Sequence, residues 1–210
     1  CTTTPLVMVL HPLRQVNPIR RVIADTYQAV SGTGAAAMIE LREQSRQVLD
    51  GQQAQVRVYP KQIAFNLFPQ VERFLDNGYT TEEWKLVRET QKILHAPEIA
   101  VSGTCVRVPV WVGHSLAVHL EFERPMAPEE ARELLSSFPG VKVLDEPGQN
   151  VYPTPWEVEG TDDVFVGRIR KDASHPNGLA MWIVVDNLRK GAALDAIQIA
   201  EELVRRDLLI

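Results

Sequence analysis

The run IAVSGTCVRVPVWVGHSLAVHLEFE, residues 99–123, decides the fold. It contains two stretches rich in β-branched residues, 99–112 and 115–123, separated only by Gly113 and His114. Runs of this composition, bounded by glycine, are typical of β-strands. The stretch therefore predicts two consecutive strands of a meandering sheet.

Further strands are predicted on both sides of this run. A strand is expected at residues 19–30, where the run IRRVIADTYQAV is bounded by Asn-Pro and Ser-Gly. Three later stretches of similar composition are expected to form strands at 141–145, 163–172 and 179–187. About five to seven strands result, and they cluster instead of alternating with helices. We expect an α+β fold whose sheet is mixed but largely antiparallel, with helices packed on one face.

Helices fill most of the remaining chain. The first is expected over residues 5–14, with capping hydroxyls at residues 2–4, Pro5 in its first turn and Pro12 preventing a long continuation. Thr81 is expected to cap the clearest helix. A further helix is expected to follow the SGTG turn and to end near Gly51, and others are expected at 80–94, 127–138 and 190–209. Residues 52–78 are expected to be ordered but irregular.

The composition excludes several classes of protein. The chain has 210 residues, 45% of them hydrophobic, with a net charge of -5 and scattered Lys and Arg, which argues against nucleic-acid binding. No apolar run approaches the ~18 residues of a membrane span, and no signal peptide is visible. Two cysteines form neither a disulfide scaffold nor a CxxC metal pair. We expect a cytoplasmic protein without a metal site.

Cys1 stands immediately before the first expected helix. A helix N-terminus favours negative charge, so a thiolate there would be stabilised for nucleophilic attack. Three explanations are open for this first residue: a nucleophile exposed by processing, an internal catalytic residue of a longer chain, or a cysteine without a chemical role. Cys105, between apolar strand residues, is expected in the core.

Other candidates for chemistry each have an ordinary structural explanation. His114 could point into a cleft beside Gly113, or be a satisfied structural histidine. Arg107, inside a strand, is either exposed or holds an anion with its guanidinium fork. Glu82 and Lys85 share a helix face and could form a solvated ion pair. Gln28 taken alone is an ordinary strand amide.

Five stretches, taken in order, resemble the aspartate-semialdehyde dehydrogenase family in its bacterial branch. They are CTTTPL, DTYQAVSGTG, EEWKLVRETQKIL, VSGTCVRVPVWVGHS and DNLRKGAALDAIQIAEEL, and the resemblance covers essentially the whole chain. It implies a fold like the C-terminal domain of glyceraldehyde-3-phosphate dehydrogenase. It also implies the reduction of L-aspartyl 4-phosphate to L-aspartate 4-semialdehyde, with release of phosphate, on the route to lysine (through diaminopimelate), threonine and methionine.

The resemblance also implies a role for each candidate residue. Cys1 would form the thioester, with His114 as general acid and base and Gln28 orienting the reacting group. Arg107 would hold the substrate carboxylate. The remaining substrate contacts would be Glu82 with the ammonium and Lys85 with the phosphate, and the cofactor NADP would meet Ser31, Gly32 and Asn187.

The family's NADP-binding domain lies mostly before the cysteine, and no glycine-rich fingerprint for it occurs in this sequence. The resemblance therefore implies that residues 1–210 form the catalytic and dimerisation domain of a homodimer or tetramer. Residues 1–15 and about 187–210 would be helices near the cofactor domain.

Three alternatives stay open. The chain could be a non-catalytic dimerisation module, or an N-terminal-nucleophile amidohydrolase in which Cys1 uses its own amine as base. Within the same chemistry, the competitor is N-acetyl-glutamyl-phosphate reductase. Its substrate has no free α-amine, so Glu82 favours the aspartyl substrate.

Overall fold

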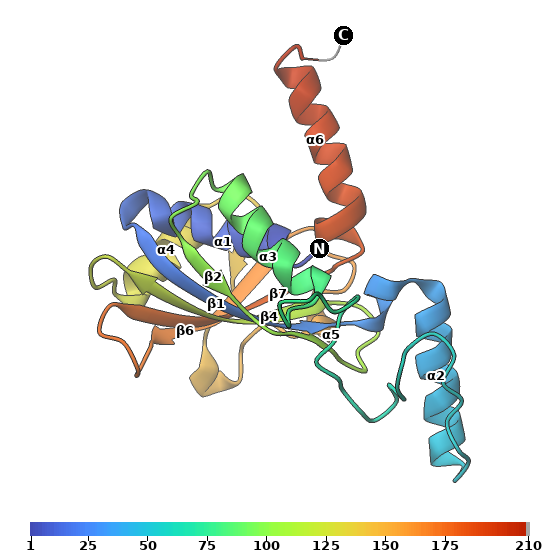
Figure 1. Ribbon diagram of the computed structural model, residues 1–210. Helices are drawn as coiled ribbons and strands as arrows, with labels where there is room; N and C mark the ends of the chain where they lie inside the picture. Colours follow the sequence, from blue (N-terminus) through green and yellow to red (C-terminus); the bar gives the residue numbers. More distant parts are fainter. Residues whose placement is uncertain (209–210) are drawn as a thin grey trace.

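The computed structural model describes residues 1–208, which form one seven-stranded sheet with helices around it (Figure 1). The strand order is β2-β1-β4-β7-β6-β5, and β3 also pairs with β1. The strands are β1 (Ile19–Gln28), β2 (Ala100–Ser102), β3 (Cys105–Arg107), β4 (His114–Phe122), β5 (Val141–Val143), β6 (Val164–Lys171) and β7 (Gly178–Val185).

The sheet is mixed, as expected. The long strands β1, β4, β7 and β6 pair antiparallel, whereas the short strands β2 and β3 run parallel to β1, and β5 runs parallel to β6. The expected single strand over 99–112 is wrong in two respects, because it is interrupted between β2 and β3 and ends at Arg107. At Gly103 the chain lies so close to β1 that an added Cβ would be 2.0 Å from the Ala24 carbonyl oxygen. Only glycine fits this approach.

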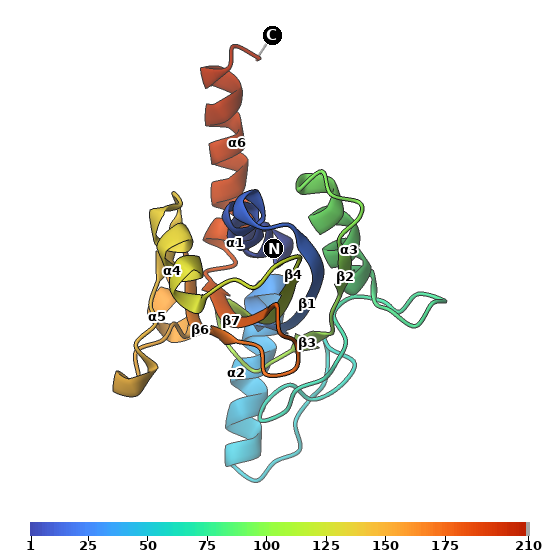
Figure 2. The ribbon, with the colours of Figure 1, turned by 90° about the vertical axis from the view of Figure 1, so that its left-hand side faces the viewer.

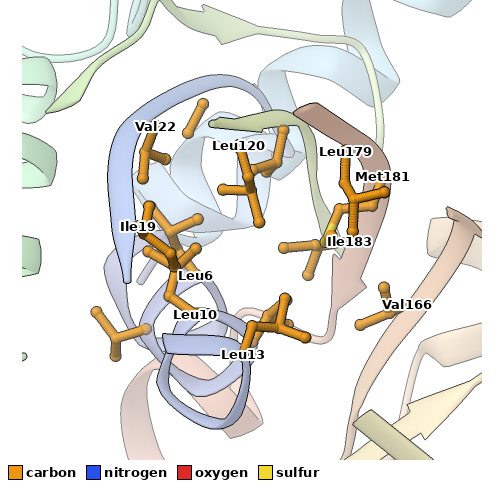
Figure 3. Packing of buried hydrophobic residues seen from close by; sticks show 14 of the residues in the cluster. Leu6, Leu10, Leu13, Ile19, Val22, Leu120, Val166, Leu179, Met181 and Ile183 are labelled. Carbon is orange, nitrogen blue, oxygen red and sulfur yellow. The ribbon is translucent and has the colours of Figure 1, made fainter. Parts of the chain in front are cut away.

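Three helices cover one face of the sheet (Figures 1 and 2): α1 (Thr3–Val16), α3 (Thr81–Ile93) and α4 (Pro128–Ser137). Leu6, Leu10 and Leu13 of α1 recur at helical spacing and are fully buried. Figure 3 shows them packed against apolar side chains of the sheet, among them Leu120 of β4 and Ile183 of β7. The burial of this stripe removes apolar surface from water and so stabilises the domain.

Helix α1 differs from the expectation at both ends. It continues through Pro12 to Val16, because the buried leucines on either side of the proline outweigh the one backbone hydrogen bond that proline removes. The threonines before Pro5 do not cap it: the helix has no side-chain cap, and the Thr3 hydroxyl donates instead to Glu89 of α3, at 2.9 Å. The first turn of α1 is therefore joined to α3.

The N-cap of helix α3 lies one residue earlier than expected. Thr80, not Thr81, accepts the Glu83 amide at 3.2 Å, and Glu83 in return accepts the Thr80 amide at 2.6 Å. This reciprocal pair is a capping box. Glu83 also accepts the Cys105 amide of β3 at 2.9 Å, so the cap positions α3 against the sheet.

Two long helices extend away from the sheet (Figure 1): α2 (Ala35–Leu49) and α6 (Leu194–Arg205). Residues 52–78 after α2 are irregular, as expected. The final helix is shorter than expected, because Lys190 and Gly191 have non-helical backbone angles, with φ +155° at Gly191. Residue 209 of that expectation lies outside the described residues. The short helices are η1 (Val30–Thr33), η2 (Pro147–Gln149), α5 (Pro155–Val158) and η3 (Arg189–Ala193).

Helices of residues 1–208 are all too short or too polar to cross a membrane.

Candidate active site

A cavity of about 510 Å³ lies where β1 and β3 end and α1 and α3 begin. Gln28 and Arg107 are the last residues of two parallel strands and pair in register, while His114 begins the antiparallel strand β4 beside them. The topology thus gathers residues that are far apart in sequence at one edge of the sheet. Six of the nine predicted site residues line the cavity: Cys1, Gln28, Gly32, Glu82, Lys85 and Arg107.

Cys1 is exposed at the cavity and stands two residues before α1. It packs against the kink before α6. A Cβ added at Gly191 would lie 3.1 Å from both the Cβ and the carbonyl oxygen of Cys1. The backbone at Gly191 has a positive φ, which residues with a side chain adopt only with strain. Gly191 therefore allows the chain after β7 to approach the cysteine.

His114 is completely buried, and its two ring nitrogens have different surroundings. The Ala29 backbone N–H donates to Nδ1 at 3.0 Å, so Nδ1 carries the lone pair and the neutral ring carries its proton on Nε2. Within residues 1–208, Nε2 has no hydrogen-bond partner. Burial and the neighbouring Arg107 charge lower the pKa of His114 well below its ordinary value. The site therefore holds a neutral imidazole with one free N–H donor.

Arg107 is buried, which removes the exposed alternative for this residue. Its Nη1 donates to the Ala29 carbonyl at 2.6 Å, and its guanidinium lies 5.8 Å from the Tyr59 ring centroid. The backbone of Arg107 exchanges two hydrogen bonds with Phe68, at 2.9 and 3.2 Å. Its Nε has no partner among the described residues. A buried guanidinium with an unused donor is suited to binding an anion.

Gly32 brings these two groups together. A Cβ added there would lie 3.1 Å from His114 Nε2 and 3.2 Å from Arg107 Nη1. Both distances are shorter than ordinary side-chain contacts. Gly32 itself lines the cavity, so the absence of a side chain there leaves space between the cavity and these two groups.

A chain of polar contacts crosses the cavity wall from β1 to α3. The Thr26 hydroxyl donates to Gln28 Oε1 at 3.0 Å, and Gln28 Nε2 donates to Glu82 Oε1 at 3.2 Å. The Lys85 ammonium lies 3.4 Å from Glu82 Oε2 and 2.6 Å from Glu72 Oε1. The Glu82 side chain is only 10% exposed, so the explanation as a solvated ion pair fails for this residue.

Ser31 and Asn187 form a second group beside the cavity. The Ser31 hydroxyl donates to Asn187 Oδ1 at 3.1 Å, and the same oxygen accepts the Gly113 amide at 2.9 Å. Both residues are buried. They place the end of β7 next to the start of β4, adjacent to His114. Contact of this group with a cofactor stays a prediction.

Four residues at the site were not found from the sequence: Thr26, Tyr59, Glu72 and Gly191. Thr26 is two residues from Gln28 on one strand, and this spacing places both on the same face of the sheet. That signal was available. Tyr59 and Glu72 lie in the irregular segment, where no periodicity indicates their orientation.

The two cysteines are expected to react very differently. Cys105 is buried in the core as predicted, and burial raises the pKa of its thiol to about 12. Because only the thiolate reacts and the pKa is raised, Cys105 stays in the unreactive thiol form near neutral pH. Iodoacetamide at about pH 8 should alkylate Cys1 and spare Cys105 in the native chain. Peptide mapping by mass spectrometry checks this, with a sample unfolded in guanidinium as control. Equal labelling of both cysteines without denaturant would contradict the expectation.

Residues 10–190 match the family model described as "Semialdehyde dehydrogenase, dimerisation domain". The chain therefore belongs to this family, and the resemblance found in the sequence is confirmed. It is 49% identical over 210 residues to aspartate-semialdehyde dehydrogenase of Aquifex aeolicus, covering 100% of this chain and 62% of the relative. The corresponding enzyme of Legionella pneumophila is 52% identical, and 60% of it is covered. The chain thus spans about three fifths of the length of these relatives.

Solved structures agree with these matches. The chain is 44% identical to aspartate semialdehyde dehydrogenase II of Vibrio cholerae, crystallised with ASA, with a TM-score of 0.94 over 97% of this chain and 60% of that one. The Candida albicans enzyme, solved with NADP, gives a TM-score of 0.74 at 26% identity, covering 100% of this chain and 57% of that one. The expected fold is confirmed by these likenesses.

Proposed function

We propose that this chain is the catalytic and dimerisation portion of an aspartate-semialdehyde dehydrogenase. The whole enzyme would reduce L-aspartyl 4-phosphate to L-aspartate 4-semialdehyde with NADPH, in the cytoplasm, for lysine, threonine and methionine synthesis. One observation carries the proposal: within residues 1–208, His114 Nε2 and Arg107 Nε are buried without partners, and both side chains lie against Gly32, which lines the same cavity as Cys1. Buried donors without partners are rare unless a ligand completes them.

The substrate would be held by three charged side chains. The Arg107 guanidinium would bind the α-carboxylate, and Glu82 would accept hydrogen bonds from the α-ammonium. Lys85 would bind the phosphate as a single positive charge. The buried carboxylate of Glu82 favours an aspartyl substrate over an N-acetylated one, because an acetamide has no positive charge with which to bind it.

Catalysis would begin when the Cys1 thiolate attacks the acyl carbon. A carbon–sulfur bond forms, the bond to the phosphate oxygen breaks, and a thioester remains on Cys1. NADPH, when bound, supplies the hydrogen and electron pair that reduce this thioester. The Nε2–H of the neutral His114 would donate a hydrogen bond to the carbonyl-derived oxygen and stabilise its negative charge until the carbon–sulfur bond breaks, the aldehyde leaves and the Cys1 thiolate is regenerated. Gln28, held by Thr26 and Glu82, would orient the reacting acyl group.

The cofactor would lie mainly on a dinucleotide-binding domain upstream of Cys1. The hydrogen-bonded pair Ser31 and Asn187 adjoins Gly113 and supports a nicotinamide edge at this side of the site. Helix α6 supports contact with a further domain, since it has no buried residue of its own and exposes Ile197 and Ile199. Isolated apolar side chains are common on surfaces, but a helix with no buried face requires a partner for stability.

The sheet face opposite α1 is the proposed surface for self-association into a dimer or tetramer. A shallow cavity of about 340 Å³ lies there, lined by His119, Tyr152 and Trp182 among others. Sedimentation of the 210-residue chain is expected to give at least twice the monomer mass of 23.6 kDa, and Trp182→Arg is expected to shift it toward the monomer, because a charge would be buried unpaired. A monomeric wild type would contradict the proposal.

The alternative functions have less support. An N-terminal-nucleophile amidohydrolase requires a layered sandwich, whereas the described residues contain one sheet with helices on one face. A dimerisation module without catalysis does not account for the buried donors around Gly32.

Joining the chain to the upstream part of the Aquifex aeolicus relative tests the proposed activity. The joined protein is incubated with L-aspartate semialdehyde, NADP and phosphate, and the formation of NADPH is followed. Phosphate-dependent NADPH formation is the expected result, with the chain alone inactive. A folded joined protein that binds NADP but forms no NADPH would leave only the assembly role.

A further inference from the structure

The Lys85 ammonium is paired with two carboxylates. Glu72 Oε1 lies 2.6 Å from Nζ and Glu82 Oε2 lies 3.4 Å from it, and all three side chains line the cavity. One positive charge between two negative ones leaves a net negative charge at this end of the cavity. An incoming phosphate would be repelled unless one carboxylate moved away.

The two carboxylates differ in how firmly they are held. The Glu82 side chain is 10% exposed, lies on α3 and accepts the Gln28 amide at 3.2 Å. The Glu72 side chain is 42% exposed and lies in the irregular segment. Among the described residues, its second oxygen accepts only the Thr81 hydroxyl. Glu72 is therefore the carboxylate that can leave Lys85 without unfolding a helix or uncovering a buried charge.

The backbone at Glu72 is also unusual. Its φ is +64°, in the left-handed region that residues with side chains seldom adopt. The neighbouring chain is fixed on both sides. Phe68 pairs with the backbone of Arg107, and the Thr81 amide donates to the Arg73 carbonyl at 2.9 Å. Strained residues held by their surroundings are frequent in segments that change conformation at binding sites.

We propose that Glu72 occupies the phosphate position on Lys85 in the ligand-free protein and moves away when phosphate, free or as the acyl phosphate, binds. This inference rests on the proposed function, which assigns the phosphate to Lys85. Glu72 is a positioning residue: it holds the ammonium in place before the substrate arrives and competes with the anion. A merely structural Glu72 would tie residues 65–75 to α3 and have no effect on anion affinity.

The test measures inorganic phosphate binding to the 210-residue chain by calorimetry at constant ionic strength. Glu72→Gln keeps the size of the side chain and its acceptor for Thr81 but removes the competing charge. Its dissociation constant for phosphate is expected to fall about fivefold, the upper range for an exposed ion pair. Asp76→Asn removes the same charge from the same segment and should stay within about twofold. Lys85→Met should weaken phosphate binding at least about tenfold, because the binding charge is lost.

Hydrogen exchange of backbone amides provides a second measurement. If Glu72 had only a structural role, phosphate would not change these exchange rates. Phosphate is expected to speed exchange of residues 70–75 and of the Thr81 amide in the wild type, and to change little in Glu72→Gln. If Glu72→Gln does not fold, Glu72→Asp retains the charge but draws it back by one methylene, and it should also bind phosphate more tightly.

Two unfavourable results are distinguishable. If Lys85→Met weakens phosphate binding but neither Glu72 variant strengthens it, the role of Glu72 is overturned and the phosphate site stands. If wild type and both Glu72 variants all fail to bind phosphate, the phosphate site is overturned, and the inference fails with it.

Discussion

Cys1→Ser is expected to reduce phosphate-dependent NADPH formation by at least about 10³-fold in the joined protein. A serine hydroxyl at this position is a far weaker nucleophile near neutral pH than a thiolate, and an ester would replace the thioester. Thr2 and Gly191 pack around residue 1 in either variant, and the change of one atom leaves the fold unaffected. The loss should therefore appear in turnover, with substrate binding retained.

The covalent intermediate can be sought directly in the wild type, with Cys1→Ser for comparison. Acid quenching of the wild type during turnover, followed by peptide mapping, should show an acyl group on the peptide that begins with Cys1. Cys105→Ala is the matched control, because its thiol is buried, and it should retain activity within about threefold. Full activity in Cys1→Ser, or the acyl group on another residue, would refute the thioester mechanism.

His114→Asn is expected to lower turnover by about 10²–10³-fold, the usual contribution of a donor that stabilises developing negative charge. The side-chain oxygen of asparagine can take the place of Nδ1 and still accept the Ala29 amide, which in the native protein lies 3.0 Å from Nδ1. The variant therefore keeps the buried structural hydrogen bond and removes the Nε2–H donor. A loss of turnover in this variant can therefore be attributed to the missing donor and not to a loss of folding.

His114→Gln is the complementary variant. Its amide reaches toward the position of Nε2 and restores a donor, but an amide does not exchange protons near neutral pH. It should recover part of the loss if Nε2–H only stabilises negative charge, and none if the proton must be transferred. Unchanged thermal stability with full activity in His114→Asn would show that the imidazole has no chemical role.

The sequence predicted the composition of the sheet and most of its elements but not its interruptions. Composition rich in β-branched residues, with turn-forming residues at the boundaries, identified the strands that became β1, β4, β6 and β7. It could not show the break at Gly103, because the cause is the carbonyl of Ala24, on a strand almost eighty positions earlier. The kink at Gly191 has a similar cause, contact with Cys1. Local patterns do not contain such close approaches between distant segments.

The sequence likewise predicted some residues of the site but not others. Resemblance indicated Cys1, Gln28, Arg107 and three further residues of the cavity, and the structure brings them together. The burial of Glu82 and the orientation of His114 depend on tertiary contacts, so the sequence left each with an ordinary explanation. Glu72 lies where the chain has no regular structure, and only its distance to Lys85 identifies it.

The hydrogen bond between the Ala29 amide and His114 has an implication for how this site tolerates genetic change. The proton on Nε2 is directed by a main-chain group, and every amino acid except proline supplies that group. Inherited substitutions at position 29 can disturb the packing of the buried residue, but every substitution other than proline retains the backbone N–H donor. The position of the proton on the imidazole is therefore determined by the backbone conformation. It should be preserved when neighbouring side chains are substituted.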